Sequence, residues 1–365
     1  MSVPTGRLTA VSSTHQDLLG ERIARHGIAG RPADSVAAAT ALTTAIQAQD
    51  NLASRLGLRA RASGPTDADV RRAIDDERTV VRTWLMRGTI HLIDARDMRW
   101  LVRLIGPSVQ RRFATRWRQL GLTDKVLARC VAVLPELLAD GPRNRHEIRA
   151  GLAERGITLD SPDPQVHTHA LVHASAIGLV CRGPDRGRHS TFVLIDDWLP
   201  RAPAGPAGDE ALAELARRYF AAYSPATAAD FTTWSALPSA RAVELIRDEL
   251  QPTDVDGRPG YRLGMVAPQR GVRLLPAFDN YLLGYRDRAA ILDPALHGAV
   301  YQGGVIRPTL LVDGRVVGTW ALDRRTGQVT VSPFGRLTPA TRQAAEAEAA
   351  DLGRFLGRDV TVRFG

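Results

Sequence analysis

Lysine is nearly missing from this chain of 365 residues, although the chain carries a formal charge of +9. Lys125 is the one lysine, and all the others among the 48 lysines and arginines are arginine. Schiff-base chemistry needs an amine nucleophile, so the side chains offer almost no means for it. Lys125 follows Thr123 and Asp124 at a predicted helix start, a position that indicates a solvated surface charge.

Cysteine and long apolar runs are also scarce. Cys130 and Cys181 are too few for a disulfide framework or a structural zinc site, and their apolar neighbours predict two small buried side chains. No apolar run approaches the roughly 18 residues of a membrane span. Residues 1–20 lack the basic start and the apolar stretch of a signal peptide. We therefore expect a cytoplasmic protein that does not engage a membrane.

The abundant arginine suits contact with phosphate, because its guanidinium fork donates two parallel hydrogen bonds. Net charge alone does not establish a nucleic-acid partner. The order of the predicted elements is more informative, because helices occur in groups of about three, each closed by a β-hairpin. The first group has predicted helices at residues 15–26, 33–45 and 66–76, and its hairpin turns at Arg87-Gly88.

The second group follows a predicted helix at residues 98–120 and has predicted helices at 126–139, 145–155 and 164–177, and then strands at 178–181 and 191–194. The segment between these strands is rich in glycine and arginine. Three helices and a hairpin with a basic tip are typical of a winged helix-turn-helix, in which the hairpin is the wing. We predict that Arg182, Arg186 and Arg188 of this wing contact DNA.

A third group and a different tail complete the chain. The third group has predicted helices at residues 209–223, 227–235 and 239–250 and a β-region at 253–275; the tail alternates apolar and polar residues. The sequence therefore predicts an α+β fold, mainly α, with three tandem winged helix-turn-helix modules and a small C-terminal β-barrel. The predicted boundaries are 1–97, 98–200, 201–275 and 276–365. Such modules also serve as protein–protein scaffolds, but three of them with this arginine excess favour duplex DNA as the partner.

Common catalytic signatures are absent, including the phosphate-cradling glycine loop and the nucleophile elbow. His167, His169 and His173 lie close together, but only Asp163 could complete a metal-binding set nearby. A packed or surface role is therefore favoured, and we predict neither a metal nor a cofactor. His169 would lie on the recognition helix of the second module, so we also predict that it contacts DNA.

The segment from Ile46 to Asp50 places two amides and a carboxylate at the end of an otherwise apolar predicted helix. On a regular helix Gln47 and Gln49 would point about 200° apart, so a shared site requires the helix to end near Gln47. From composition alone, a polar helix end with satisfied amides is the simpler interpretation.

Four segments together favour a functional role for the two glutamines over the structural one. They are Ala45–Asp50, Arg87–Leu92, Leu274–Arg288 and Val312–Trp320. Their order and spacing resemble the AlkZ/YcaQ family of bacterial DNA glycosylases over nearly the whole chain. The long motif around Phe278 is specific, whereas Gln-Ala-Gln alone is a weak signal. The resemblance implies three winged-helix modules and a barrel curved around duplex DNA. It also implies removal of alkylated purines and unhooking of interstrand crosslinks made by genotoxic natural products.

The resemblance implies that Gln47 and Gln49 are catalytic, since they match the AlkZ branch, which often protects antibiotic producers. The scarcity of lysine then predicts a monofunctional enzyme. We hypothesise that Gln49 orients the attacking water and that Gln47 fixes the water or the sugar, and the reverse assignment stays open. Asp50 is a rival general base.

Three further residues in these segments are predicted to contact DNA. Arg87 and His91 lie on the first wing near Gln47, where a structural role is the alternative. The motif around Phe278 is predicted mainly to brace the third module against the barrel, with Arg286 reaching DNA.

Two other functions stay open at this point. A winged-helix regulator without catalytic activity would show sequence-specific sites and a symmetric dimer, whereas three dissimilar modules fit a monomer better. A drug-sequestering protein would bind the genotoxin itself and release no base.

Overall fold

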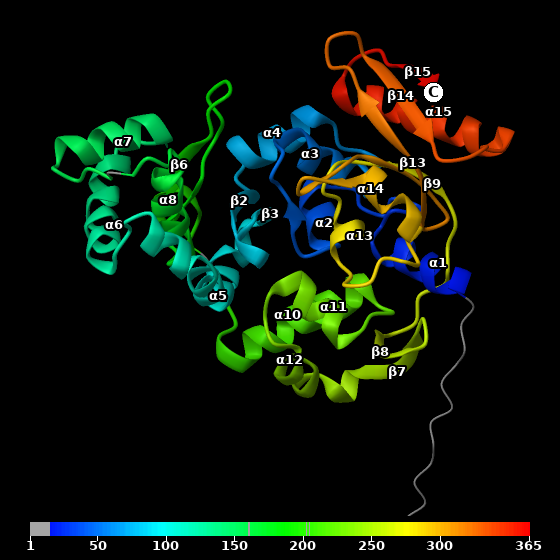
Figure 1. Ribbon diagram of the computed structural model, residues 1–365, viewed down its shortest axis with the longest axis horizontal. Helices are drawn as coiled ribbons and strands as arrows, with labels where there is room; N and C mark the ends of the chain where they lie inside the picture. The colour runs from blue at the N-terminus through cyan, green and yellow to red at the C-terminus, as the bar shows by residue number, and fades with distance from the viewer. Residues whose placement is uncertain (1–14, 160, 202, 204) are drawn as a thin grey trace, which may run out of the picture.

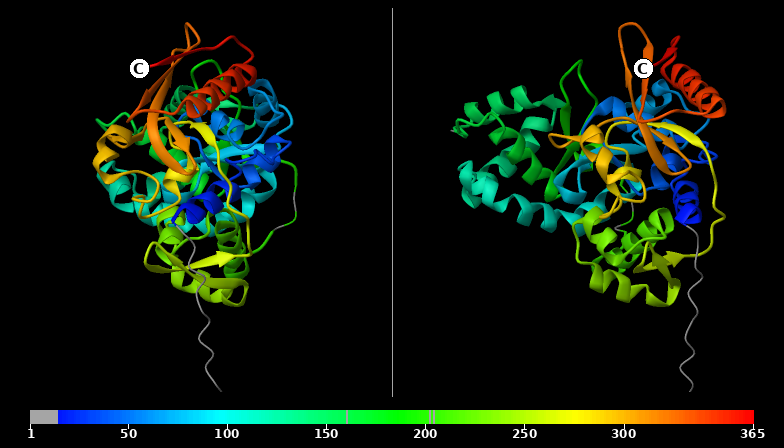
Figure 2. Two further views of the ribbon diagram at one scale, coloured as in Figure 1. Left: turned by 90° about the vertical axis from the view of Figure 1, so that its right-hand side faces the viewer. Right: turned by 45° about the vertical axis from the view of Figure 1, so that its right-hand side comes forward.

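The computed structural model describes residues 15–365 except 160, 202 and 204, so the first 14 residues of the predicted first module lie outside the described residues. The fold mixes helices and strands throughout. In Figure 1 the first group of elements lies near the centre, with the second group to its left and the third group below it. Both views of Figure 2 place the C-terminal sheet and the third group at opposite ends of the molecule. The first group therefore lies between the other parts.

The first group begins with α1 (His15–Arg25) and follows the predicted caps and turn. Thr66 starts α4 (Asp67–Asp75) with a capping box. The hairpin of β2 (Val80–Trp84) and β3 (Ile90–Asp94) turns at Arg87 and Gly88, whose φ angles are 57° and 68°. A Cβ atom at Gly88 would lie 2.5 Å from Cε2 of Phe113, so the turn needs glycine for its backbone and for its packing.

The helix predicted at residues 33–45 is shorter in the structure. Helix α2 is Val36–Ala41, and the left-handed φ of 66° at Thr44 is incompatible with continuing it. The chain then extends into the short strand β1 (Ile46–Gln47). The helix therefore ends before Gln47, as a shared amide site requires. A further helix, α3 (Asn51–Arg59), was not revealed by the sequence pattern.

Four helices between residues 98 and 176 lie close to the predicted positions: α5 (Met98–Gln119), α6 (Asp124–Leu138), α7 (Arg145–Glu154) and α8 (Val166–Ala176). The short α9 (Ile195–Trp198) was not predicted. The hairpin of the second group consists of β5 (Val180–Arg182) and β6 (Thr191–Leu194), and β6 also pairs with β4 (Arg143–Asn144). The connection between β5 and β6 projects as the green loop of Figure 1, and we refer to residues 182–190 as the second wing.

The hairpins of the first two groups join in one six-stranded sheet, which the sequence did not predict. Its strand order is β1-β3-β2-β5-β6-β4, and β2 meets β5 where Arg82 pairs with Arg182. The pairing covers strand edges that would otherwise leave N–H and C=O groups free. It also places the base of the second wing against the first group.

The third group comprises α10 (Gly208–Tyr223), α11 (Ala228–Ser235), α12 (Ser239–Leu245) and the hairpin of β7 (Leu250–Val255) and β8 (Arg258–Leu263). Strand β9 (Val272–Leu275) was predicted within this group, but it pairs along its length with β12 (Thr309–Val312). The structure therefore assigns β9 to the C-terminal sheet.

The C-terminal sheet has the order β15-β14-β13-β12-β9 and includes β13 (Arg315–Leu322), β14 (Gln328–Pro333) and β15 (Thr361–Phe364). Its edge strands β15 and β9 are not paired with each other among the described residues, so the sheet is a curled half-barrel where a small β-barrel was predicted. Helix α15 (Pro339–Leu356) lies between β14 and β15 in the chain, and this crossover makes the two strands parallel. The connection from β9 to β12 contains α13 (Asn280–Leu283), α14 (His297–Val300), β10 (Tyr301–Gln302) and β11 (Val305–Ile306).

Helix α15 is joined to the rest of the fold through the buried carboxylate of Glu348. Its Oε1 accepts hydrogen bonds from Arg31, at 2.5 Å, and from Arg273 of β9. Its Oε2 accepts from Arg59 of α3 at 3.2 Å. One carboxylate therefore links α15 to the first group and to the sheet. Within the described part of the chain, no helix is both long and apolar enough to cross a membrane.

Candidate active site

Gln47 is buried, and two backbone contacts and one side-chain contact hold it in place. Its backbone is fixed on β1 by pairing with His91 of β3, and its N–H donates to Oδ1 of Asn280 at 3.1 Å. Its side-chain Oε1 accepts a hydrogen bond from the Arg87 guanidinium at 2.8 Å. Because Gln47 is only 6% exposed, these contacts fix the position of its amide group.

Arg87 holds Gln47 rather than projecting into solvent. Besides its bond to Gln47, the guanidinium donates to the carbonyl oxygen of Trp234 on α11. Burial lowers the pKa of Arg87 to about 10, and the nearby Arg288 and Arg112 act in the same direction. Arg87 therefore stays charged at neutral pH. Of the two roles weighed for it, the structural one is present in the folded chain, and a DNA contact stays a prediction.

His91 is the neighbour of Gln47 on β3, and it lies inside the fold. Its side chain is 1% exposed, and its Nδ1–H donates to the carbonyl oxygen of Thr89 at 3.0 Å. Burial, followed by the charge of Arg87, lowers the pKa of His91 to about 3, so the ring is neutral at physiological pH. The DNA contact predicted for His91 stays a prediction, and in this structure the ring has a structural role inside the fold.

Gln49 and Asp50, unlike Gln47, are exposed. Oε1 of Gln49 accepts a hydrogen bond from the N–H of Ile90 at 3.2 Å. An amide oxygen has two lone pairs, so this contact leaves one acceptor position for water. Oδ1 of Asp50 caps α3 by accepting from the N–H of Ala53 at 2.7 Å. Asp50 thus has a structural role that is independent of any catalytic one.

Asn280 is the residue that sequence reasoning missed as a partner of Gln47. Its Nδ2 donates to the carbonyl oxygen of Ala45 and, at 3.0 Å, to the hydroxyl of Tyr223. Together with its bond to the N–H of Gln47, these contacts fix the backbone on both sides of Ile46. The only sequence signal for Asn280 was its place in the long motif.

The remainder of that motif braces three parts of the molecule. Asp279 forms two hydrogen bonds of 2.9 Å with the buried Arg61 of the first group. Tyr281 donates to the carbonyl oxygen of Gly314 beside the C-terminal sheet, and Tyr285 donates to that of Tyr223 in the third group. The predicted bracing of the third group against the C-terminal sheet is confirmed, and it extends to the first group.

A polar hollow of about 310 Å³ opens beside Gln49. Gln49 and Asp50 line it from the first group, Arg182 and Ser190 from the second wing, and Arg324 from the turn between β13 and β14. Three segments that are far apart in the sequence therefore meet next to the exposed glutamine.

The second wing is tied to the first group at its base. Oδ2 of Asp185 accepts hydrogen bonds from Asn51 at 2.7 Å and from Arg82 at 2.8 Å. At the tip, Arg186 and Arg188 are exposed, and Arg186 forms an ion pair with Glu147 at 3.4 Å. Both arginines are accessible, so their DNA contacts stay predictions.

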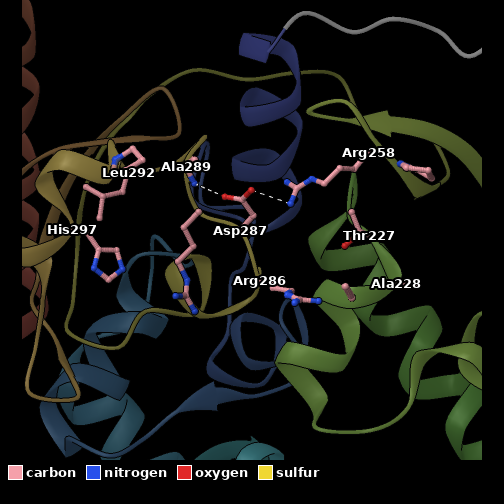
Figure 3. Close-up of a pocket in the computed structure, with 12 residues that line it drawn as sticks. Thr227, Ala228, Arg258, Arg286, Asp287, Ala289, Leu292 and His297 are labelled. Atoms are coloured by element: carbon pink, nitrogen blue, oxygen red, sulfur yellow. Dashed lines mark hydrogen bonds and ion pairs between the residues drawn. The ribbon is translucent and has the colours of Figure 1, made fainter.

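Arg286 lines a second hollow, of about 870 Å³ (Figure 3). Its side chain is exposed, and its backbone N–H donates to Asp230 at 2.7 Å. Arg258 lies nearby but is already paired with Asp287 at 2.9 Å, the ion pair drawn in Figure 3. Arg286 is accessible to a ligand, and its DNA contact also stays a prediction.

The histidines of α8 pack against aromatic side chains of α5. His169 lies edge-on to Phe113 with 5.3 Å between the ring centres, and His173 lies edge-on to Trp117 at 5.2 Å. Burial lowers the pKa of both histidines. The packed role is confirmed. The DNA contact predicted for His169 stays a prediction, and its side chain is packed against Phe113 and only 9% exposed.

Comparison with known proteins gives the class of this protein. Residues 40–355 match the family described as DNA glycosylase AlkZ-like, so the chain belongs to this family of DNA glycosylases. One curated relative is the interstrand DNA cross-link repair glycosylase of Streptomyces sahachiroi. It is 29% identical over 335 residues, which cover 86% of this chain and 88% of the relative.

A solved structure supports the same assignment. The Streptomyces sahachiroi DNA glycosylase AlkZ matches this fold with a TM-score of 0.81 and 26% identity, over 97% of this chain and 100% of that one. The family resemblance of the four sequence segments is therefore confirmed.

Proposed function

We propose that this protein is a monofunctional glycosylase that removes N7- and N3-alkylated purines from duplex DNA. The observation that carries the proposal is the pair of glutamines. Gln47 is held rigidly by Arg87 and Asn280, and Gln49 opens two residues later into a hollow lined by arginine. Phosphate and a reacting nucleotide could both be bound there.

The reaction does not need strong general-acid catalysis, because an alkylated purine is already cationic and leaves readily. The enzyme has to position water and stabilise the positive charge that develops on the sugar. The carbonyl oxygen of Gln49 has an acceptor position for that water. The carbonyl oxygen of Gln47 already accepts from a guanidinium, so we assign Gln47 to positioning.

Further parts of the proposal rest on the relatives. The curated relative is named for interstrand crosslink repair, and we propose that this chain also unhooks crosslinks of natural-product genotoxins, as self-resistance requires. The three helix groups would act as tandem winged helix-turn-helix modules of a cytoplasmic, nucleoid-bound monomer. Lys125 is exposed on α6 and does not line the hollow beside Gln49, which supports hydrolysis without strand cleavage.

The test is single-turnover release of base from a duplex that carries one N7-alkylguanine. Gln47→Ala and Gln49→Ala should each lower the rate constant on the order of 100-fold, because each removes a group that fixes the water or the sugar. Asp50→Ala should lower folding stability through the lost cap but retain release.

Gln251→Ala is the matched control, since Gln251 is exposed on β7 in the third group. Release that disappears only in Asp50→Ala would move catalysis to the carboxylate. A wild-type protein that binds duplex DNA tightly but releases no base from several adducts and crosslinks would be a regulator instead.

A further inference from the structure

The hollow beside Gln49 is lined by a partly buried cation, Arg182, for which no anionic hydrogen-bond partner is found among the described residues. The guanidinium of Arg182 stacks on Trp84 and Phe192, with Cζ at 4.7 and 4.8 Å from the ring centres. Among the described residues, Nε of Arg182 is buried without a hydrogen-bond partner. Burial lowers the pKa of Arg182 to about 10, which leaves it charged at neutral pH. The stacking fixes the guanidinium in place before any ligand arrives.

The neighbouring charges leave Arg182 available to an external anion. Asp185, the carboxylate of the wing, accepts hydrogen bonds from Asn51 and Arg82 through Oδ2, and no hydrogen bond joins its Oδ1 to Arg182 among the described residues. Asp50 lines the hollow from the first group and caps α3. An anion would therefore bind next to Arg182, Ser190 and Arg324, which line the same hollow.

Arg324 comes from a different part of the chain and lines the same hollow. It lies in the exposed turn between β13 and β14, and no hydrogen bond of its side chain is found among the described residues. Two guanidiniums and a hydroxyl facing one hollow match the oxygens of a phosphodiester. The volume of about 310 Å³ is near the lower end of the usual range of about 300–1,000 Å³ for ligand sites.

We propose that this hollow binds a backbone phosphodiester of the lesion strand next to the damaged nucleotide, and that Arg182 and Arg324 are positioning residues for the reaction. The inference rests on the proposed function, because Gln49 lines the same hollow. A phosphate held there brings the adjoining sugar to the amide of Gln49. Its negative charge also faces the positive charge that develops on that sugar.

The test measures binding without catalysis, by fluorescence anisotropy of a duplex with a tetrahydrofuran abasic-site analogue. Arg324→Gln should weaken binding about tenfold, the loss of one charge-assisted contact. Arg325→Gln is the matched control, because it removes the same charge from the same turn but does not line the hollow. It should change binding less than about twofold. Arg182→Gln should act like Arg324→Gln, and thermal unfolding checks that it folds.

A neutral methylphosphonate, placed at one phosphate at a time, identifies the contact. At one position on the lesion strand it should weaken wild-type binding about tenfold and have no further effect in Arg324→Gln. Penalties that multiply at every position, equal effects of Arg324→Gln and Arg325→Gln, or coupling confined to the complementary strand would each overturn the proposal.

Base release by the wild type distinguishes this failure from failure of the proposed function. Release without methylphosphonate coupling overturns the phosphate site alone. Coupling without release from any adduct overturns the glycosylase proposal and leaves the phosphate site supported. No binding of the duplex would overturn both.

Discussion

At the scale of single residues, His91 shows how burial changes the role of a polar side chain beside Gln47. Its ring donates to a backbone carbonyl and is shielded from water, so the neutral form is the one that fits the fold. A buried ring of this kind makes folding sensitive to acid, because the unfolded chain can take up the proton and the folded chain cannot.

We expect the free energy of unfolding to fall as the pH falls below the unfolded histidine value of about 6.5. The folded pKa of about 3 at His91 predicts a loss of about 2 kcal/mol between pH 7 and pH 5, and His26, whose pKa burial also lowers, adds to it. Urea unfolding at the two pH values measures this loss. His91→Gln should reduce the pH-dependent difference by about 2 kcal/mol, and His189→Gln, at an exposed position, should leave it unchanged. An equal pH dependence in all three proteins would contradict the burial argument.

The candidate site could be predicted from sequence only as far as its local motifs reach. Gln47 and Gln49 were singled out as a pair, and the end of the helix before them followed from the geometry that a shared site needs. The partner Asn280 lies 233 residues away from Gln47, and a single asparagine has no periodic pattern that would disclose the contact. The burial of His91 was equally invisible, because it depends on β1 pairing with β3.

At the scale of elements, α15 docks through a charge network rather than through apolar contacts alone. Glu348 faces Arg31, Arg59 and Arg273, and it is only 7% exposed. Desolvation is the largest effect on the pKa of Arg31 and lowers it to about 10 in spite of this carboxylate. The cost of burying these guanidiniums is therefore offset by the nearby carboxylates. Removing the charge of Glu348 should weaken the contact of α15 with both the first group and the C-terminal sheet.

Glu348→Gln should destabilise the protein by about 3–5 kcal/mol, because it leaves buried guanidiniums without their anion. Glu346→Gln is the control, since it removes the same charge from an exposed position of α15. Chemical denaturation followed by circular dichroism measures both variants. Similar stability of the two would mean that Asp351, which also pairs with Arg31 and Arg59, is a sufficient counter-ion.

The elements themselves were largely predictable because their signals are local. Thr66 and Thr227 stand at the starts of helices, where their side chains accept backbone hydrogen bonds, and Gly88 marks a left-handed turn. The pairing of strands, in contrast, was not predictable. Neither the pairing of β2 with β5 nor that of β9 with β12 could be read from the alternation of side chains, because that alternation shows which face of a strand is buried but not which edge meets which.

At the scale of the whole molecule, the fold gathers basic side chains from separate segments onto the side that holds Gln49. Arg182 comes from the second wing and Arg324 from the C-terminal sheet. Many other arginines are already neutralised inside the fold, as Arg61 is by Asp279 and Arg262 is by Glu21. Net charge therefore overstates the number of cations that are free to meet phosphate, and accessible unpaired arginines are the better guide.

This distinction can be measured through the salt dependence of DNA binding. Each phosphate neutralised by the protein contributes about −0.9 to the slope of log K against log salt concentration. Arg188→Gln should make the slope less steep by about 0.9, because Arg188 is exposed at the wing tip and no ion pair holds it among the described residues. Arg241→Gln should leave the slope unchanged, because Asp209 and Glu244 already neutralise Arg241 on α12. Equal slopes for wild type and Arg188→Gln would place the wing away from the DNA, and a slope near zero for the wild type would argue against duplex DNA as the partner.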